Sequence, residues 1–337
     1  MISAFVVIFC FIGSFSLTAA VRRFAILKSV MDIPNARSSH SVPTPRGGGV
    51  AIVVCFLLAL PCLYGIQAIS GETLLALLGA GAGVALLGFF DDLGHIAARW
   101  RLIGHFFAAI WIVFLIGGLA PLEAFGFSLS LGWVGHVLAV LYLVWMLNLY
   151  NFMDGIDGLA SSQAIFVTVA AALIWLIGGY TGMALLSLAL AASAAGFLCW
   201  NFPPAKIFMG DAGSGFLGIV LGGMSLLAAW TAPNFFWSWL ILLGVFIVDA
   251  TFTLLRRLLR KEKLYEAHRS HAYQFASRYY SSHRTVTLTV WLVNIIWLFP
   301  LALCVAFDVI DGALGTLIAY VPLVWLAIKF KAGALER

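Results

Sequence analysis

The sequence predicts an all-α, polytopic membrane protein with about 11 transmembrane helices. Of its 337 residues, 63% are hydrophobic and only 10% are charged, and the mean hydropathy is +1.05. A water-soluble domain carries about 25% charged residues, so this composition excludes a soluble globular fold. The longest polar interval, residues 256–284, is too short to fold as a separate domain. We therefore expect one integral-membrane domain over residues 1–337.

The predicted spans follow from runs of about 20 mostly apolar residues, the length that an α-helix needs to cross a bilayer. Eleven such runs lie at residues 2–21, 47–67, 72–90, 102–120, 133–150, 159–178, 182–200, 215–231, 234–255, 285–307 and 312–330. Several of these runs contain glycine, which suits close packing between helices in lipid.

Positive charges divide the connecting segments into two classes. Residues 22–46, 91–101, 200–214, 256–284 and the C-terminal end hold five, two, one, eight and three Lys and Arg residues, which is all 19 in the chain. The intervening segments carry only acids. By the positive-inside rule, the N-terminus lies outside the cytoplasm and the C-terminus lies inside. The predicted cytoplasmic loops are then residues 22–46, 91–101, 151–158, 200–214 and 256–284.

Five aspartates lie at the predicted cytoplasmic ends of the spans: Asp91, Asp92, Asp154, Asp157 and Asp211. Carboxylates at such depth are energetically costly and mark function. If they converge, their mutual repulsion requires a cation or bound protons. Carboxylate and amide oxygens suit Mg²⁺ or Mn²⁺. The alternative is that each acid is a solvated helix end, but five acids among Gly-rich turns favour a metal site.

A second pattern repeats polar residues at intervals of three: Asn148, Asn151, Asp154 and Asp157. Residues three apart on a helix stay on one side and drift by about 60° at each step. We therefore expect these side chains to line one wall of a substrate pocket, with Asn201, at the end of the seventh run, as a further binding residue. The alternative is a helix C-terminus followed by an aspartate N-cap.

The segment Gly210-Asp211-Ala-Gly213-Ser214-Gly opens the eighth run. Free N–H groups at a helix start attract phosphate or a metal–phosphate unit. The spacing is not that of a P-loop, because no Lys-Ser/Thr pair follows; a tight turn into a membrane helix is the alternative. Phe208 either stacks on a base or anchors the chain at the membrane interface.

Basic side chains supply the other half of the predicted site. His268, Arg269 and His271 lie in a segment dense with Arg and Lys, where they are either anion ligands or part of a patch for anionic lipids. His40 and Arg46, in a loop rich in Pro and Gly, are similar candidates. Acids, a divalent cation and anion ligands together fit a diphosphate, and walls of membrane helices imply that one substrate is a lipid.

Three segments carry a family resemblance: Phe-Phe-Asp91-Asp92, Asn-x-x-Asn151-x-x-Asp154-Gly-x-Asp-Gly and Phe-Met-Gly-Asp211-x-Gly-Ser. They resemble the signature segments of the polyprenyl-phosphate N-acetylhexosamine-1-phosphate transferases, glycosyltransferase family 4. The resemblance runs from about residue 32 to 284. It implies a multi-pass enzyme of the bacterial inner membrane. Such an enzyme transfers sugar 1-phosphate from a UDP-N-acetylhexosamine to undecaprenyl phosphate and releases UMP.

The resemblance implies roles for the residues around the metal. Asp211 and Asn151 would bind Mg²⁺, with Mn²⁺ as an alternative, and Asp91 and Asp92 would act at the lipid phosphate as base or positioning groups. We favour a single in-line attack by the lipid phosphate, which is already mostly ionised at neutral pH because its second pKa lies near 6. A covalent aspartyl-phosphate intermediate is the rival mechanism.

The resemblance also implies which groups meet the nucleotide sugar. Asp154, Asp157 and Phe208 would hold the uridine, and His268 and His271 would touch the diphosphate or the sugar. The partners are then a UDP-N-acetylhexosamine, undecaprenyl phosphate and membrane lipids. No nucleic acid is expected, and the family's dimers leave a homodimer open.

One departure narrows the substrate. The stretch His268-Arg-Ser-His271 stands where the lipid I synthases of peptidoglycan assembly have three consecutive histidines, which argues against a muramyl-pentapeptide substrate. The stretch and the predicted eleven spans are most similar to the branch that initiates O-antigen synthesis. Whether the sugar is N-acetylglucosamine, N-acetylfucosamine or N-acetylquinovosamine stays open.

Other classes of membrane protein fit less well. A nucleotide-sugar transporter would place polar groups near the middle of the bilayer and often shows internal repeats, whereas these acids gather at one face. A CDP-alcohol phosphotransferase needs an Asp-Gly-x-x-Ala-Arg motif, which the segment beginning at Asp157 does not supply. A purely structural scaffold would leave the acids unexplained.

Overall fold

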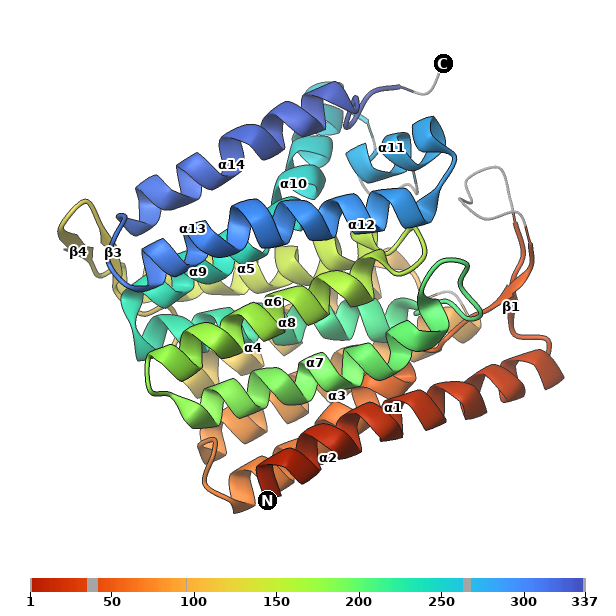
Figure 1. Ribbon diagram of the computed structural model, residues 1–337, viewed down its shortest axis with the longest axis horizontal. Helices are drawn as coiled ribbons and strands as arrows, with labels where there is room; N and C mark the ends of the chain where they lie inside the picture. The colour runs from red at the N-terminus through yellow and green to blue at the C-terminus, as the bar shows by residue number, and fades with distance from the viewer. Residues whose placement is uncertain (1, 35–41, 95, 263–267, 336–337) are drawn as a thin grey trace.

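The computed structural model describes residues 2–34, 42–94, 96–262 and 268–335, and it confirms an all-α membrane fold with two minimal hairpins. The helices form one bundle, with the N-terminus at one end and the C-terminal segment at the other (Figure 1). In chain order they are α1 (Ile2–Leu27), α2 (Val50–Gly65), α3 (Gly71–Gly94), α4 (Ala98–Ile116), α5 (Gly132–Met153), α6 (Leu159–Ile177), α7 (Thr181–Asn201), α8 (Asp211–Thr231), α9 (Pro233–Leu242), α10 (Gly244–Leu259), α11 (Ala272–Tyr280), α12 (His283–Val293), the π-helix η1 (Asn294–Leu298), α13 (Phe299–Ala306) and α14 (Gly312–Lys329).

Two antiparallel hairpins mark the two ends of the bundle. Strands β1 (Met31–Asp32) and β2 (Thr44–Pro45) lie at the end that also holds α11, and β3 (Leu122–Ala124) and β4 (Phe127–Leu129) lie at the opposite end (Figure 1). The end with β1 and α11 is the predicted cytoplasmic end. Basic side chains tie its segments together: Arg22 donates to the carbonyl of Lys206 at 3.1 Å, and Arg256 to that of Ala332 at 3.1 Å.

Each of the eleven predicted apolar runs is helical, but not all are full-length spans. Among the described residues, nine helices are long and apolar enough to cross a membrane, or ten if the bent pair α9–α10 is one span. Helix α2 has only 16 residues. It starts later than predicted because Gly48 and Gly49 donate their N–H groups to the carbonyls of Phe208 and Met209, both at 2.9 Å.

Helix α8 is the central element of the bundle. It contacts α2, α3, α4, α5, α6 and α9. Of the apolar 18-residue stretch that could cross the membrane, 94% is buried inside the protein. Glycines make this possible: a Cβ on Gly218 would lie 2.7 Å from the Cα of Leu147 on α5. Small residues let membrane helices approach closely, and here Gly218 lets α5 lie directly against α8.

The break between α9 and α10 is the largest departure from the predicted spans. The two helices meet at an angle of 69°. A break in a membrane helix frees backbone groups that need new partners, and Gln163 of α6 donates to the carbonyl of Leu242 at 3.0 Å. Asn294 in turn donates to the Gln163 side chain at 2.6 Å. The side chains of Gln163 and Asn294 therefore form a chain of hydrogen bonds that stabilises the break.

Helix α3 meets the first turn of α8 at Gly88. A Cβ there would lie 2.6 Å from the backbone of Asp211 and from the amide nitrogen of Ala212, closer than real Cβ contacts. Gly83, on the same helix, has nothing within 4 Å of its ideal Cβ. The approach of α3 to α8 therefore depends on one glycine and not on the other.

We expect Gly88→Ala to lower the stability of the protein by about 1–3 kcal/mol, because the added methyl overpacks a backbone contact. Gly83→Ala is the matched control and should leave stability unchanged. The midpoint of thermal unfolding in detergent measures both. Equal midpoints for the two variants would show that α3 and α8 are not in close contact.

Candidate active site

The two neighbouring acids at the end of α3 point to different partners. Residues adjacent on a helix are about 100° apart. Asp92 accepts hydrogen bonds from the N–H groups of Asp211 at 3.1 Å and Ala212 at 3.4 Å, so it caps the start of α8. Asp91 instead accepts the N–H of Ile96 at 2.7 Å and pairs with Arg101. The two acids, both predicted to act at the lipid phosphate, thus lie in two different environments.

Two arginines bind the acids into one cluster. Arg46 lies 2.6 Å from Asp92 and 3.0 Å from Asp211. Arg101, which pairs with Asp91, also lies 3.4 Å from the other oxygen of Asp211. Three carboxylates thus face two guanidinium groups, and one negative charge is left uncompensated by this set. We call Asp91, Asp92, Asp211, Arg46 and Arg101 the carboxylate cluster.

Backbone contacts hold Arg46 in the cluster. The N–H of Phe208 donates to the carbonyl of Pro45 at 2.8 Å, and that of Gly48 donates to the carbonyl of Phe208 at 2.9 Å. The loop after β2 therefore lies along the segment that leads into α8. Phe208 itself is half-buried.

Asn151, in the last turn of α5, completes the surroundings of Asp211. Its side-chain amide donates to Asp211 at 3.1 Å and to Ser214 at 2.9 Å. Among the described residues, no three His, Cys, Asp or Glu side chains are arranged to hold a metal alone. Magnesium commonly binds one or two carboxylates and takes its other oxygens from water and substrate phosphates. Asp211 fits that kind of shared site, and Asn151 beside it would add its amide oxygen once the side-chain amide turns, since its nitrogen now faces Asp211.

A cavity of about 390 Å³ opens beside the cluster. Its polar lining includes Asp91, Arg101, Asn148, Asn151 and Asp211. The rest is mostly apolar and comes from α3, α4, α5, α8 and α10: Val84, Leu87, Leu102, Leu141, Val144, Trp145, Leu147, Phe152 and Leu254. A cavity that is charged at one end and apolar along its walls suits an amphipathic ligand with an anionic head.

Asn148 and His105 lie on the wall of this cavity. The Asn148 amide donates to the carbonyl of Val144 at 2.7 Å and lies 3.5 Å from a ring nitrogen of His105. His105 also lines the cavity itself, so it borders the site.

The structure separates Asp154 from Asp157. Asp154 follows α5, and burial raises the pKa of its carboxyl well above the usual value, with Asp211 adding to the effect. Asp157 accepts the N–H of Ala205 at 3.0 Å and lies 3.3 Å from Nδ1 of His283. Asp154 thus belongs with the carboxylate cluster electrostatically, whereas Asp157 joins three segments of the same end.

Asp157 lines a second cavity, of about 660 Å³, together with His283, Arg269, Arg278 and Arg284. This basic lining suits an anion. Its place beside the segment after α5 brings Arg269, a predicted substrate ligand, near Asp157 rather than near Asp211.

Asn201 lies behind these cavities and is buried. Its amide oxygen accepts from the N–H of Gly158 at 3.0 Å and from the Ser161 hydroxyl at 3.2 Å, and its nitrogen donates to the carbonyl of Ile207 at 3.0 Å. These bonds make it a brace between two loops, and neither cavity is lined by it. His40 lies outside the described residues.

The two predicted histidines stack on each other, with ring centroids 4.9 Å apart. Burial, with His271 beside it, lowers the pKa of His268 to about 3, so His268 is neutral at physiological pH. Its Nδ1 lies 2.9 Å from the Ser270 hydroxyl. His271 lies 3.3 Å from Asp249 of α10, so this acid contacts the loop from inside a predicted span.

Sequence reasoning missed Arg101, Ser214 and His283. Arg101 had a signal: it follows Asp91 by ten residues, at the start of the next helix on the same face. Ser214 lay within a segment that had been singled out, but nothing in the sequence indicated its bond to Asn151. His283 is separated from Asp157 by 126 residues, so its contact needs the tertiary fold.

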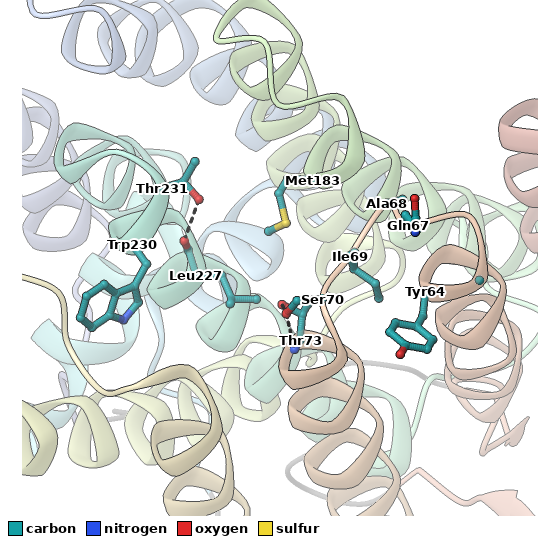
Figure 2. A pocket seen from close by; sticks show the side chains of 11 residues that line it. Tyr64, Gln67, Ala68, Ile69, Ser70, Thr73, Met183, Leu227, Trp230 and Thr231 are labelled. Carbon is teal, nitrogen blue, oxygen red and sulfur yellow. Dashed lines mark hydrogen bonds between the residues drawn. The ribbon is translucent and has the colours of Figure 1, made fainter.

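The largest of the three cavities, about 750 Å³, is not part of this site. It lies between the α2–α3 connection, the start of α7 and the end of α8 (Figure 2). None of its lining residues is charged, and two of them, Trp230 and Thr231, end α8, whereas Asp211 begins it. The acids and bases of the candidate site are therefore confined to the opposite end of the bundle.

Sequence comparisons with known proteins find relatives that cover most of the chain. The family model for glycosyl transferase family 4 matches residues 74–229. A probable undecaprenyl-phosphate N-acetylglucosaminyl 1-phosphate transferase of Bacillus subtilis is 35% identical over 83% of this chain and 79% of its own. A phospho-N-acetylmuramoyl-pentapeptide-transferase of Shouchella clausii is 32% identical over 75% and 81%, respectively. An undecaprenyl-phosphate alpha-N-acetylglucosaminyl 1-phosphate transferase of Thermotoga maritima is 28% identical over 82% and 83%.

We expect Arg101→Gln to destabilise the protein by about 1–2 kcal/mol, because Asp91 and Asp211 lose a compensating charge. The side chain is 37% exposed, so solvent screens part of the effect. Thermal unfolding measures the loss of stability. Arg99→Gln is the control, because it removes the same charge from the same helix at a side chain that lies over the ring of Trp100 and outside the carboxylate cluster. The double variant Asp91→Asn/Arg101→Gln should regain stability; a further loss would show that charge is not the cause.

Proposed function

Since the chain belongs to glycosyl transferase family 4, we propose that it transfers N-acetylhexosamine 1-phosphate from a UDP-sugar to undecaprenyl phosphate. The products are undecaprenyl-diphospho-sugar and UMP. The observation that carries the proposal is the carboxylate cluster at the charged end of an apolar cavity. Relatives that cover most of the chain are sugar-phosphate transferases acting on polyprenyl phosphates by name, and a transporter has no support among them.

The cavity beside the cluster is the proposed place of the lipid phosphate. Its apolar walls accept the first units of a polyprenyl chain, and Arg101 faces the phosphate. The phosphate is mostly ionised at neutral pH, so no strong base is required. Asp91, held by Arg101 and the N–H of Ile96, then orients Arg101 rather than removing a proton.

Asp211 and Asn151 would hold Mg²⁺ together with oxygens of the diphosphate. When bound, the ion neutralises charge on the diphosphate and on the leaving UMP. Arg46, between Asp92 and Asp211, is placed to add to that neutralisation. The lipid phosphate oxygen forms a bond to the sugar-proximal phosphorus, and the bond from that phosphorus to the bridging oxygen of UMP breaks.

The position of Asp92 favours direct attack over an aspartyl-phosphate intermediate. Both of its carboxylate oxygens accept N–H groups at the start of α8, and Arg46 lies 2.6 Å from one of them. A carboxylate engaged in this way is a poor nucleophile. Its role is to hold the first turn of α8, and with it Asp211.

The proposed sugar is N-acetylglucosamine, since two of the relatives above are named for it. The product would initiate O-antigen or a related cell-envelope polysaccharide. By the positive-inside rule, the basic loops at one end of the bundle support a location of this chemistry on the cytoplasmic side of the bacterial inner membrane.

Purified protein in detergent should release UMP from UDP-N-acetylglucosamine only when undecaprenyl phosphate and Mg²⁺ are both present. Asp211→Asn should lower turnover by at least about 10³-fold, because it removes the ion's carboxylate, while the protein still inserts and unfolds at a similar temperature. UMP release that needs neither lipid nor metal would refute the proposal. Passage of intact labelled UDP-sugar across sealed proteoliposomes, with no UMP formed, would establish the transporter instead.

A further inference from the structure

The second cavity, of about 660 Å³, has a strongly basic lining. Arg269 reaches it from the loop before α11, Arg278 from α11 and Arg284 from α12. Among the described residues that line it, Asp157 is the one acid. Positive groups thus outnumber negative ones by three to one, before His283 is counted. Like charges gathered in one cavity repel one another, so an anion that enters lowers the free energy of the lining.

Aromatic rings hold two of these arginines in place. The guanidinium of Arg278 lies 4.5 Å from the ring centroid of Phe275, and that of Arg284 lies 6.0 Å from the ring centroid of Phe202. A ring beneath a guanidinium covers its face and leaves N–H groups at its edge. Such a planar fork of N–H groups matches the oxygens of a phosphate. The cavity therefore offers two prearranged phosphate ligands, one from each of two neighbouring helices.

The cavity lies at the start of a membrane span. Helix α12 begins at His283, beside α11 (Figure 1), and with η1 and α13 it is long and apolar enough to cross a membrane. Ser282 caps it by accepting the N–H of Thr285 at 3.1 Å, and the positive end of the helix dipole adds to the attraction for an anion. Tyr279 and Tyr280, at the end of α11, are exposed. Because tyrosine is enriched at the level of the lipid headgroups, this is the depth at which phospholipid phosphates lie.

An exposed apolar stripe continues from the cavity along α12. Leu288 and Leu292 follow Arg284 at intervals of four residues, so the three side chains lie on one face of the helix. Both leucines are exposed. A phospholipid needs this combination, a basic group at headgroup level above an apolar track toward the middle of the bilayer. An inorganic phosphate or a nucleotide has no use for the track, so the arrangement favours a lipid as the source of the phosphate.

The second cavity is separate from the proposed reaction cavity, since no described side chain lines both. Asp157, the acid predicted to hold the uridine, directs both carboxylate oxygens at protein groups. One oxygen accepts the N–H of Ala205 at 3.0 Å, and the other lies 3.3 Å from Nδ1 of His283. A carboxylate engaged in this way has little to offer a nucleobase. The lining instead presents arginine N–H groups, which suit phosphate oxygens.

We propose that this cavity binds the phosphate of an anionic phospholipid, with Arg278 and Arg284 as its principal ligands. The headgroup lies at the predicted cytoplasmic end of the bundle, and an acyl chain follows Leu288 and Leu292 along α12. Basic groups at the cytoplasmic face attract the anionic lipids of that leaflet. The site goes beyond the proposed function, because its lipid is neither of the two substrates. One arginine comes from each helix, so a bound lipid joins α11 to α12.

The test measures the affinity of the full-length protein, in a neutral detergent, for dioctanoyl phosphatidylglycerol by native mass spectrometry. The unaltered protein should bind the lipid saturably. Dioctanoyl phosphatidylcholine, which has no net charge, should bind more weakly. Arg278→Gln and Arg284→Gln should each weaken the binding of phosphatidylglycerol about 10-fold, because each removes a charge-assisted hydrogen bond to the phosphate.

Arg99→Gln is the matched control. Arg99 is also an exposed arginine near the predicted cytoplasmic end, and it lies over an aromatic ring, that of Trp100, at 5.7 Å. It does not line this cavity, so its loss should leave the affinity for phosphatidylglycerol unchanged. UDP-N-acetylglucosamine added with Mg²⁺ should not displace the bound lipid, because the two ligands occupy different cavities.

Four results would overturn the inference. An equal loss of affinity in the Arg99→Gln variant would show a general effect of surface charge, and no loss in the Arg278→Gln and Arg284→Gln variants would remove these arginines from the site. Displacement of the lipid by inorganic phosphate at an equal concentration would indicate a site for the free anion. Displacement by UDP-N-acetylglucosamine would assign the cavity to the substrate. The test does not measure turnover, so its outcome is distinct from failure of the proposed function.

Discussion

The site depends on the close approach of the end of α3 to the first turn of α8. Gly88 allows the backbones to touch, and Asp92 then accepts the N–H groups that α8 leaves free at its start. A helix start that is buried needs such partners. Because Asp211 is the first residue of α8, the same contact that satisfies the backbone fixes the position of the proposed metal ligand.

Charge compensation explains how the carboxylate cluster is stable in the absence of substrate. Three carboxylates in one place would repel each other, and Arg46 and Arg101 offset most of that repulsion. In the proposed reaction, a diphosphate with a divalent cation would bring both signs of charge into the cluster. The arginines would then pair with the phosphates while the cation compensates Asp211, and the charge of the cluster would stay nearly balanced.

Hydropathy and charge were enough to predict the helices and the end of the bundle where the polar residues gather, because lipid imposes both patterns on the sequence. The break between α9 and α10 was not predictable, since a run of apolar residues has the same hydropathy whether it is straight or bent by 69°. Nor was the division of labour between Asp91 and Asp92, or the brace formed by Asn201. These depend on which neighbours tertiary packing brings to each side chain.

We propose that the cation and the diphosphate meet at Asp211, which α3 and α8 hold in position. Crystals of the protein grown with UDP-N-acetylglucosamine and Mn²⁺ would locate both, because Mn²⁺ scatters anomalously and replaces Mg²⁺ at oxygen ligands. We expect one anomalous peak within coordination distance of the Asp211 carboxylate and of diphosphate oxygens. A peak at another group of side chains, or a diphosphate bound away from Asp211, would contradict it.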